Sequence, residues 1–140
     1  MTLPITAEQV ALVQQSWPEV FPIRETAATL FYDRLFALDP SLRLLFPADM
    51  AAQGSKLFET LNAVVFQLDD LATLDRLARA LGRSHAGYGA TAGHYRTVRD
   101  ALMWVLQGSL GVRFDAALQA AWAAAYDRLA AAMLEGSAAA

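Results

Sequence analysis

Two histidines are the strongest candidates for metal binding in this sequence, and His85 is the better placed of the pair. The residues before it at helical spacing are all apolar, so its imidazole continues the apolar face of an amphipathic helix formed by Leu74, Leu77, Ala78 and Leu81. The next residues, 86–89, include two glycines that permit the chain to leave helical geometry. Such an imidazole either donates to a nearby carbonyl as an ordinary core residue, the commoner case, or binds a ligand in an apolar pocket.

Two further polar side chains interrupt apolar faces and could contact the same ligand. Tyr32 lies among large apolar residues, where a buried tyrosine ordinarily packs its ring and finds one hydrogen bond. Gln53 opens a helix, where polar residues are common. In chain order the sequence has a Phe-Tyr pair, a Leu-Phe-Pro corner, a Gln at the start of a long helix and a His before Gly. The combination is more informative than any one member.

The elements that must position these residues are all expected to be helices. The segment 6–9, Thr-Ala-Glu-Gln, is a capping-box pattern, and the helix it opens should stop near Pro18 or Pro22. The second helix should bury Tyr32 and point Asp33 and Arg34 outward. No segment alternates with a period of two, so we expect an all-α protein with further helices at about 25–38, 39–47, 49–68, 71–87, 92–106 and 114–135.

Length and composition favour one helical domain over residues 1–140, with a frayed Ala-rich tail after about Gly136. The hydrophobic fraction is 56%, and much of it is alanine, the best helix former. A net charge of −3 without a basic block argues against nucleic acid as a partner. A nucleic-acid-binding function is therefore not expected.

The chain is expected to be a cytoplasmic protein that does not enter a membrane. Its N-terminal residues lack the basic and apolar regions of a signal peptide, and no run reaches the roughly 18 apolar residues that a span needs. There is no cysteine, which excludes disulfides, thiolate ligands and thioether attachment of a cofactor. Any cofactor must therefore be held without a covalent bond to sulfur.

Six stretches in this order resemble the globin family, specifically the single-domain bacterial globins related to the haem domain of flavohaemoglobins and to Vitreoscilla haemoglobin. The resemblance is closest to the short variety typified by the globin of Methylacidiphilum, and it covers essentially the whole chain. It implies a globin fold, a 3-on-3 helical sandwich that encloses a haem. The matching stretches are residues 30–36, 45–47, 53–57, 82–85 with 88–89, 94–95, and 121–122 with Tyr126.

The resemblance assigns His85 as the proximal ligand of the iron in a non-covalent haem b, and it leaves water, hydroxide or the Tyr32 oxygen as the sixth ligand of ferric iron. The second ring nitrogen of His85 then needs an acceptor, which the Leu81 carbonyl or the Ser84 hydroxyl could supply. On the distal side, where gas binds, the resemblance places Tyr32, Gln53 and Leu57.

The resemblance also assigns residues around the porphyrin. Phe46 would pack flat on it at the helix corner, and Tyr88, Tyr95 and Val98 would close the proximal side and the haem edge. Lys56 would reach a haem propionate, and an ordinary solvated lysine is an equal alternative.

Three features limit what the resemblance implies. Many relatives couple the proximal histidine to a tyrosine and a late glutamate; Tyr95 matches the tyrosine, but Ser137 stands at the glutamate position. Glu135 lies two residues away, about 200° around the helix, so strong peroxidase-like activation is not expected. His94 should begin its helix near solvent or a propionate and should not reach the distal face. No flavin- and NAD-binding reductase module is expected on this chain.

The leading hypothesis for function is a haem globin that binds dioxygen reversibly and tightly through Tyr32 and Gln53, and also binds CO and NO, for oxygen transport, storage or scavenging. The alternative is a nitric oxide dioxygenase that detoxifies NO to nitrate with a separate reductase. The pocket supports both, and turnover with a reductase would separate them. A haem-free signalling globin fold is disfavoured because His85 is present, and a gas sensor because no output domain follows.

Overall fold

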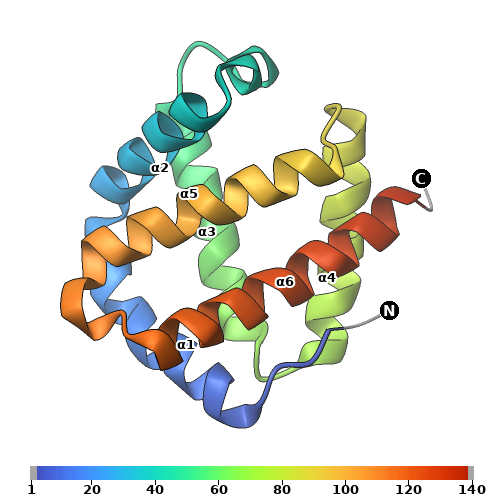
Figure 1. Cartoon of the computed structure of the whole chain (residues 1–140). Helices are drawn as coiled ribbons and strands as arrows, with labels where there is room; N and C mark the ends of the chain where they lie inside the picture. Colours follow the sequence, from blue (N-terminus) through green and yellow to red (C-terminus); the bar gives the residue numbers. More distant parts are fainter. Residues whose placement is uncertain (1–2, 139–140) are drawn as a thin grey trace.

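The computed structural model describes residues 3–138, and all its regular elements are helical (Figure 1). Within these residues there is no strand, which confirms the all-α prediction. In chain order the elements are α1 (Ala7–Val20), the 3-10 turn η1 (Phe21–Ile23), α2 (Arg24–Leu38), η2 (Pro40–Leu45), α3 (Ala51–Gln67), α4 (Leu71–Gly87), α5 (Ala92–Leu110), η3 (Gly111–Arg113) and α6 (Ala116–Ala138).

The helices form two layers of three. Helices α1, α3 and α4 make up one layer, in which α3 contacts both others, and α2, α5 and α6 make up the other, in which α5 contacts both others. The most extensive contacts between the layers are those of α6 with α4 and of α6 with α1 (Figure 1). This is the 3-on-3 sandwich that the resemblance implies. None of the helices within residues 3–138 is long and apolar enough to cross a lipid bilayer.

Aromatic residues from three helices fill the core between α1, α3 and α6. The Trp17 ring lies 5.8 Å from both Phe58 and Trp122, centroid to centroid. Both indole nitrogens are satisfied, since Trp17 donates to Asn62 and Trp122 donates to the buried Ser16 hydroxyl. Buried indoles need such partners, so this cluster joins the helices without an unpaired donor.

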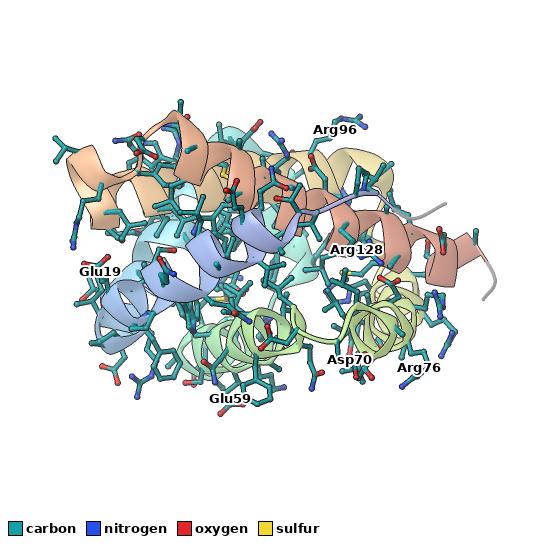
Figure 2. The ribbon with its side chains drawn as sticks, turned by 90° about the horizontal axis from the view of Figure 1, so that it is seen from below. Glu19, Glu59, Asp70, Arg76, Arg96 and Arg128 are labelled. Atoms are coloured by element: carbon teal, nitrogen blue, oxygen red, sulfur yellow. The ribbon has the colours of Figure 1, made fainter. Side chains whose placement is uncertain are left out.

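Helices α4 and α6 approach each other at two glycines, and this contact fixes the helix that carries His85. A β carbon on Gly82 would collide with the Met133 carbonyl, and one on Gly136 would collide with the Arg79 carbonyl. A second link lies further along, where Arg128 of α6, labelled in Figure 2, donates two hydrogen bonds to the Asp75 carboxylate of α4, of 2.8 and 3.2 Å. The Asp75 carboxylate is thus buried with its charge paired.

The ends of α1 and α5 can be compared with the prediction. Helix α1 ends at Val20, between Pro18 and Pro22 as predicted, and the turn η1 follows before α2 begins. Helix α5 runs to Leu110 rather than 106, because Gly108 remains helical and the chain turns only at Gly111, whose φ is +58°. A positive φ is accessible to glycine without strain, so Gly111 ends the helix.

Two predicted side-chain orientations were wrong. Leu77 is 48% exposed, whereas Leu74 and Ala78 are buried, so the apolar face of α4 is narrower than the sequence indicates. Arg34 does not point into solvent, because its guanidinium carbon lies 5.1 Å from the Trp104 ring centroid. The predicted fraying after Gly136 is not seen at residues 137 and 138, which continue α6; residues 139–140 lie outside the described part.

Candidate functional site

An open, apolar cavity lies between α3, α4, α5 and α6. Its volume is about 150 Å³, and it continues into open solvent. Few polar groups face it, and two of them are imidazoles. The cavity is lined by Leu57, Thr60, Leu61, Leu81, His85, Ala90, His94, Tyr95, Val98, Tyr126, Leu129, Ala130 and Met133.

His85 presents a lone pair suited to a metal. It lies in the last turn of α4, where the close contact with α6 holds the backbone. Its Nδ1 is 2.8 Å from the Leu81 carbonyl oxygen. Because a carbonyl can only accept, Nδ1 must carry the proton, and the neutral ring keeps its lone pair on Nε2. The Ser84 hydroxyl points to the Ala80 carbonyl instead, so Leu81 supplies the acceptor for His85.

His94 has the opposite arrangement of its ring proton. It is the third residue of α5, and its Nδ1 accepts a 3.1 Å hydrogen bond from the Thr91 backbone N–H. The Thr91 hydroxyl accepts from the His94 backbone N–H in return, so the two residues form a capping box. The neutral His94 ring therefore carries its proton on Nε2 and can donate a hydrogen bond, but it offers no lone pair to a metal.

The cavity wall contains a buried hydroxyl with no hydrogen-bond partner. Tyr95 is 9% exposed, and its phenol oxygen is buried without a partner. Burial raises the pKa of Tyr95, which keeps the phenol protonated. Its neighbour Tyr126 donates a 2.6 Å hydrogen bond to the Tyr95 carbonyl, and burial also raises the pKa of Tyr126.

Within residues 3–138 no carboxylate is hydrogen-bonded to the Tyr95 hydroxyl. The Ser137 hydroxyl donates to the Leu134 carbonyl of its own helix. Glu135 lies 4.0 Å from the Arg79 guanidinium, an ion pair between α6 and α4. The buried Tyr95 hydroxyl is therefore left for a group that enters the cavity.

A second group of candidate residues gathers around Tyr32. Its ring lies 5.4 Å from the Phe46 ring and 6.0 Å from Phe36, and those two rings lie 5.6 Å apart. The Gln53 amide nitrogen lies 3.5 Å from the Tyr32 hydroxyl, a long hydrogen bond. Burial raises the pKa of Tyr32, and the hydrogen bond from Gln53 opposes that shift. Because the phenol oxygen accepts from Gln53, its own hydrogen is available to another acceptor.

The structure brings most of the predicted site residues together, in two adjoining groups. Five of them line the cavity: Leu57, Leu81, His85, Tyr95 and Val98. Tyr32, Phe46 and Gln53 are not part of its lining; they form the aromatic and amide cluster next to it. Leu57 joins the two groups, because it lies one helical turn after Gln53 on α3.

Three further predicted residues belong to neither group. The Lys56 side chain is exposed, as a propionate contact and a solvated lysine would both require. The Ser84 hydroxyl binds its own helix. Tyr88 is 70% exposed, with its ring 6.3 Å from that of His85 in an edge-on arrangement.

Sequence reasoning missed part of the cavity wall. Thr60, Ala90 and Ala130 line it, and small or neutral residues of this kind carry no chemical signal in a sequence. Tyr126 also lines the cavity, whereas the sequence indicated it only as part of a stretch that resembles the globin family. Leu129 and Met133 also line the cavity, and their helical spacing from Trp122 is a pattern by which a sequence can indicate an inward-facing stripe.

These features fit a haem. An open cavity with an apolar lining suits a flat macrocycle, the His85 Nε2 lone pair would meet an iron, and the buried Tyr95 hydroxyl lacks a partner without a ligand. The His94 Nε2–H is a donor for an acidic group of the same ligand.

The comparisons with known proteins agree with this geometry. The globin family model matches residues 29–133. Neuroglobin of Danio rerio is 28% identical to this chain over 146 residues, which cover 94% of the chain and 92% of that protein. An engineered carbene transferase derived from RmaNOD, a proposed nitric oxide dioxygenase of Rhodothermus marinus, is 28% identical, with a TM-score of 0.86 over 97% of this chain and 95% of that one.

A Drosophila melanogaster globin shares the fold, with a TM-score of 0.85 at 18% identity over 94% of each chain. Globins normally bind haem and small gas ligands, which suits the cavity and its imidazole. With the family model matching most of its length and the two-layer helical fold in place, the chain belongs to the globin family.

Proposed function

We propose that this chain binds a non-covalent haem b in the cavity and holds dioxygen reversibly and tightly, with CO and NO as further ligands. The observation that carries the proposal is the 2.8 Å contact between His85 Nδ1 and the Leu81 carbonyl. It leaves the Nε2 lone pair of a ring that lines an apolar cavity. When bound, the haem supplies an iron that takes up gas ligands. The chain lacks the cysteines that thioether attachment needs.

In this proposal the residues on one side of the cavity hold the haem, and those on the other side contact the gas. His85 holds the iron, while Leu81, Tyr95 and Val98 pack on the same side. Tyr32 and Gln53 act as hydrogen-bond donors to the gas, and Leu57 keeps water away from it. A donor aimed at a charged acceptor in a place of low dielectric contributes roughly 1.5–3 kcal/mol.

The periphery of the haem would be held by Phe46, Tyr88 and two polar residues. Phe46 would pack on the porphyrin, next to Tyr32. Lys56 projects from α3 toward solvent, where a propionate would emerge. The Ser84 hydroxyl donates to a carbonyl of its own helix, so Ser84 would contribute to the site only through its position next to His85.

We further propose that the chain is a cytoplasmic, single-domain globin over residues 1–140, related to the bacterial globins of the flavohaemoglobin kind. The similarity to the Rhodothermus marinus protein supports this subtype. The absence of a carboxylate partner for Tyr95 within residues 3–138 distinguishes it from relatives with a tyrosine–glutamate pair.

Nitric oxide dioxygenase activity is the second candidate function. The similarity to RmaNOD, a proposed nitric oxide dioxygenase, favours it. The reaction joins NO and dioxygen with one electron to give nitrate, so each turnover needs an electron from a separate reductase. The pocket residues would be those already described, because the same gas must be held first.

Spectra and turnover of the purified protein test both proposals. Absorption spectra of the oxidised, reduced and oxygenated protein should show a haem that binds dioxygen reversibly. Continuous conversion of NO to nitrate with an added reductase would establish the enzyme, whereas a carrier would stop as ferric protein after one cycle. A purified protein that cannot take up haem would contradict both.

A further inference from the structure

The segment 46–50 between η2 and α3 has no helical structure of its own, yet it carries Phe46 and leads directly into the helix that bears Gln53. Figure 1 shows it in teal, beyond the end of α2. The backbone carbonyls of an irregular segment need partners from outside it or from water. The position of Phe46 therefore depends on what binds these carbonyls.

One side chain binds three of them. The Arg43 Nη1 donates to the Phe46 and Pro47 carbonyls at 3.2 and 2.9 Å, and Nη2 donates to the Ala48 carbonyl at 3.2 Å. A guanidinium suits this task, because its N–H groups are fixed in one plane. Among the described residues Arg43 forms no ion pair, so its N–H groups are used for these three carbonyls.

The same guanidinium also touches the aromatic cluster. Its central carbon lies 5.5 Å from the Phe36 ring centroid, within the range of a cation–π contact. Phe36 in turn packs against Phe46 and Tyr32. Phe46 is thus held twice, by its backbone through Arg43 and by its ring between Phe36 and Tyr32.

We propose that Arg43 is a positioning residue for the Tyr32 hydroxyl. It fixes the backbone at 46–48, which keeps the Phe46 ring against Tyr32 and so orients the phenol beside Gln53. This role rests on the proposed function of Tyr32 as a donor to the gas. Lysine cannot replace Arg43 fully, because a single ammonium group cannot hold three carbonyls in the plane of a guanidinium.

Hydrogen exchange of the haem-loaded protein tests the structural half of the proposal. In Arg43→Met the backbone amides of residues 46–54 should exchange faster than in the parent protein, because the segment 46–50 loses the hydrogen bonds from Arg43 and opens locally more often. The matched control is Arg24→Met: Arg24 also lies over a ring, 4.5 Å from the Phe21 centroid, and donates to the Phe21 carbonyl at 3.1 Å. That variant should leave residues 46–54 unchanged. Equal exchange of this segment in Arg43→Met and the parent would overturn the proposal.

Gas release tests the functional half. Arg43→Met should release dioxygen about three- to tenfold faster, with CO release within about twofold of the parent, and Arg43→Lys should lie between parent and Arg43→Met. In a Tyr32→Phe background, Arg43→Met should add nothing, since the donor it positions is gone. The same acceleration in both backgrounds would show that Arg43 does not act through Tyr32.

The outcomes separate this proposal from the proposed function. If Tyr32→Phe releases dioxygen faster but neither Arg43 variant does, the proposed function stands and the role of Arg43 is wrong. If Tyr32→Phe itself releases dioxygen at the parent rate, the role of Arg43 is wrong, and if Gln53→Leu does so as well, the proposed function is also wrong. Should Arg43→Met lose its haem, Arg43→Lys, which keeps the charge, gives the same comparison.

Discussion

His85 and His94 line the same cavity but carry their ring protons on opposite nitrogens. The Leu81 carbonyl accepts from His85 Nδ1, whereas His94 Nδ1 accepts from the Thr91 backbone. Each hydrogen bond fixes a tautomer, so only His85 has its Nε2 lone pair free. The difference lies in the backbone group near each ring, since the two side chains are chemically identical.

Tyr32→Phe should speed dioxygen release about ten- to a hundredfold, because a donor to a charged acceptor contributes roughly 1.5–3 kcal/mol. CO is a poorer acceptor, so its release should hardly change. Gln53→Leu should act in the same direction but more weakly, as its contact with the Tyr32 oxygen is 3.5 Å long. Stopped-flow release of both gases checks this. Parent rates for dioxygen in both variants would refute tight binding through these donors.

Removal of haem should lower the melting temperature by about 10 °C or more, because a tightly bound ligand stabilises only the folded state. The empty cavity, of about 150 Å³, would also leave its apolar lining without packing partners. Calorimetry of the loaded and haem-free protein measures the difference. Identical melting temperatures would mean that the haem does not occupy the cavity.

Gly82→Ala should destabilise the protein by about 1–3 kcal/mol and loosen its haem, because the new methyl group collides with the Met133 carbonyl and displaces α4. Gly108→Ala is the matched control. It lies in helix α5 with open space around its Cα, so alanine there should stabilise the protein by about 0.5–1 kcal/mol. Urea unfolding and haem transfer to an acceptor protein report both effects. Similar stabilities for the two variants would count against the close contact of α4 and α6.

The free energy of unfolding should fall as the pH rises above about 10, because burial raises the pKa of Tyr126 above its value of 10.0 in the unfolded chain. Above that pH the unfolded chain loses the proton while the folded protein keeps it, so the stabilisation is complete below pH 10 and is lost above it. Tyr126→Phe should flatten the slope in urea unfolding between pH 9 and 11. Tyr88→Phe, at an exposed position, should leave the slope as it is.

The helices could be predicted because their apolar periodicity is strong. Trp122, Leu129 and Met133 fall on one face of α6, and all are buried. Leu77 was placed wrongly because it lies about 60° around the helix from Leu74, just outside the arc that α4 buries. A periodic pattern indicates the direction of a face more reliably than its width.

The residue types of the site could be predicted, but their hydrogen bonds could not. The Leu81 acceptor was one of two options, and only coordinates show that Ser84 turns to Ala80. The Arg43 contacts with three carbonyls depend on the path of an irregular segment, which no periodicity describes. The Asp75–Arg128 pair joins residues 53 positions apart and depends on how α4 meets α6.

The central claim is that His85 holds the iron of a haem, and spectra of two alanine variants test it most directly. We expect the reduced, ligand-free parent protein to be mainly five-coordinate, because neither Tyr32 nor Gln53 binds ferrous iron well. His85→Ala should lose its haem or hold it loosely, whereas His94→Ala should keep the parent spectrum because its ring acts only as a donor. The reverse result, a parent spectrum in His85→Ala and haem loss in His94→Ala, would contradict the account.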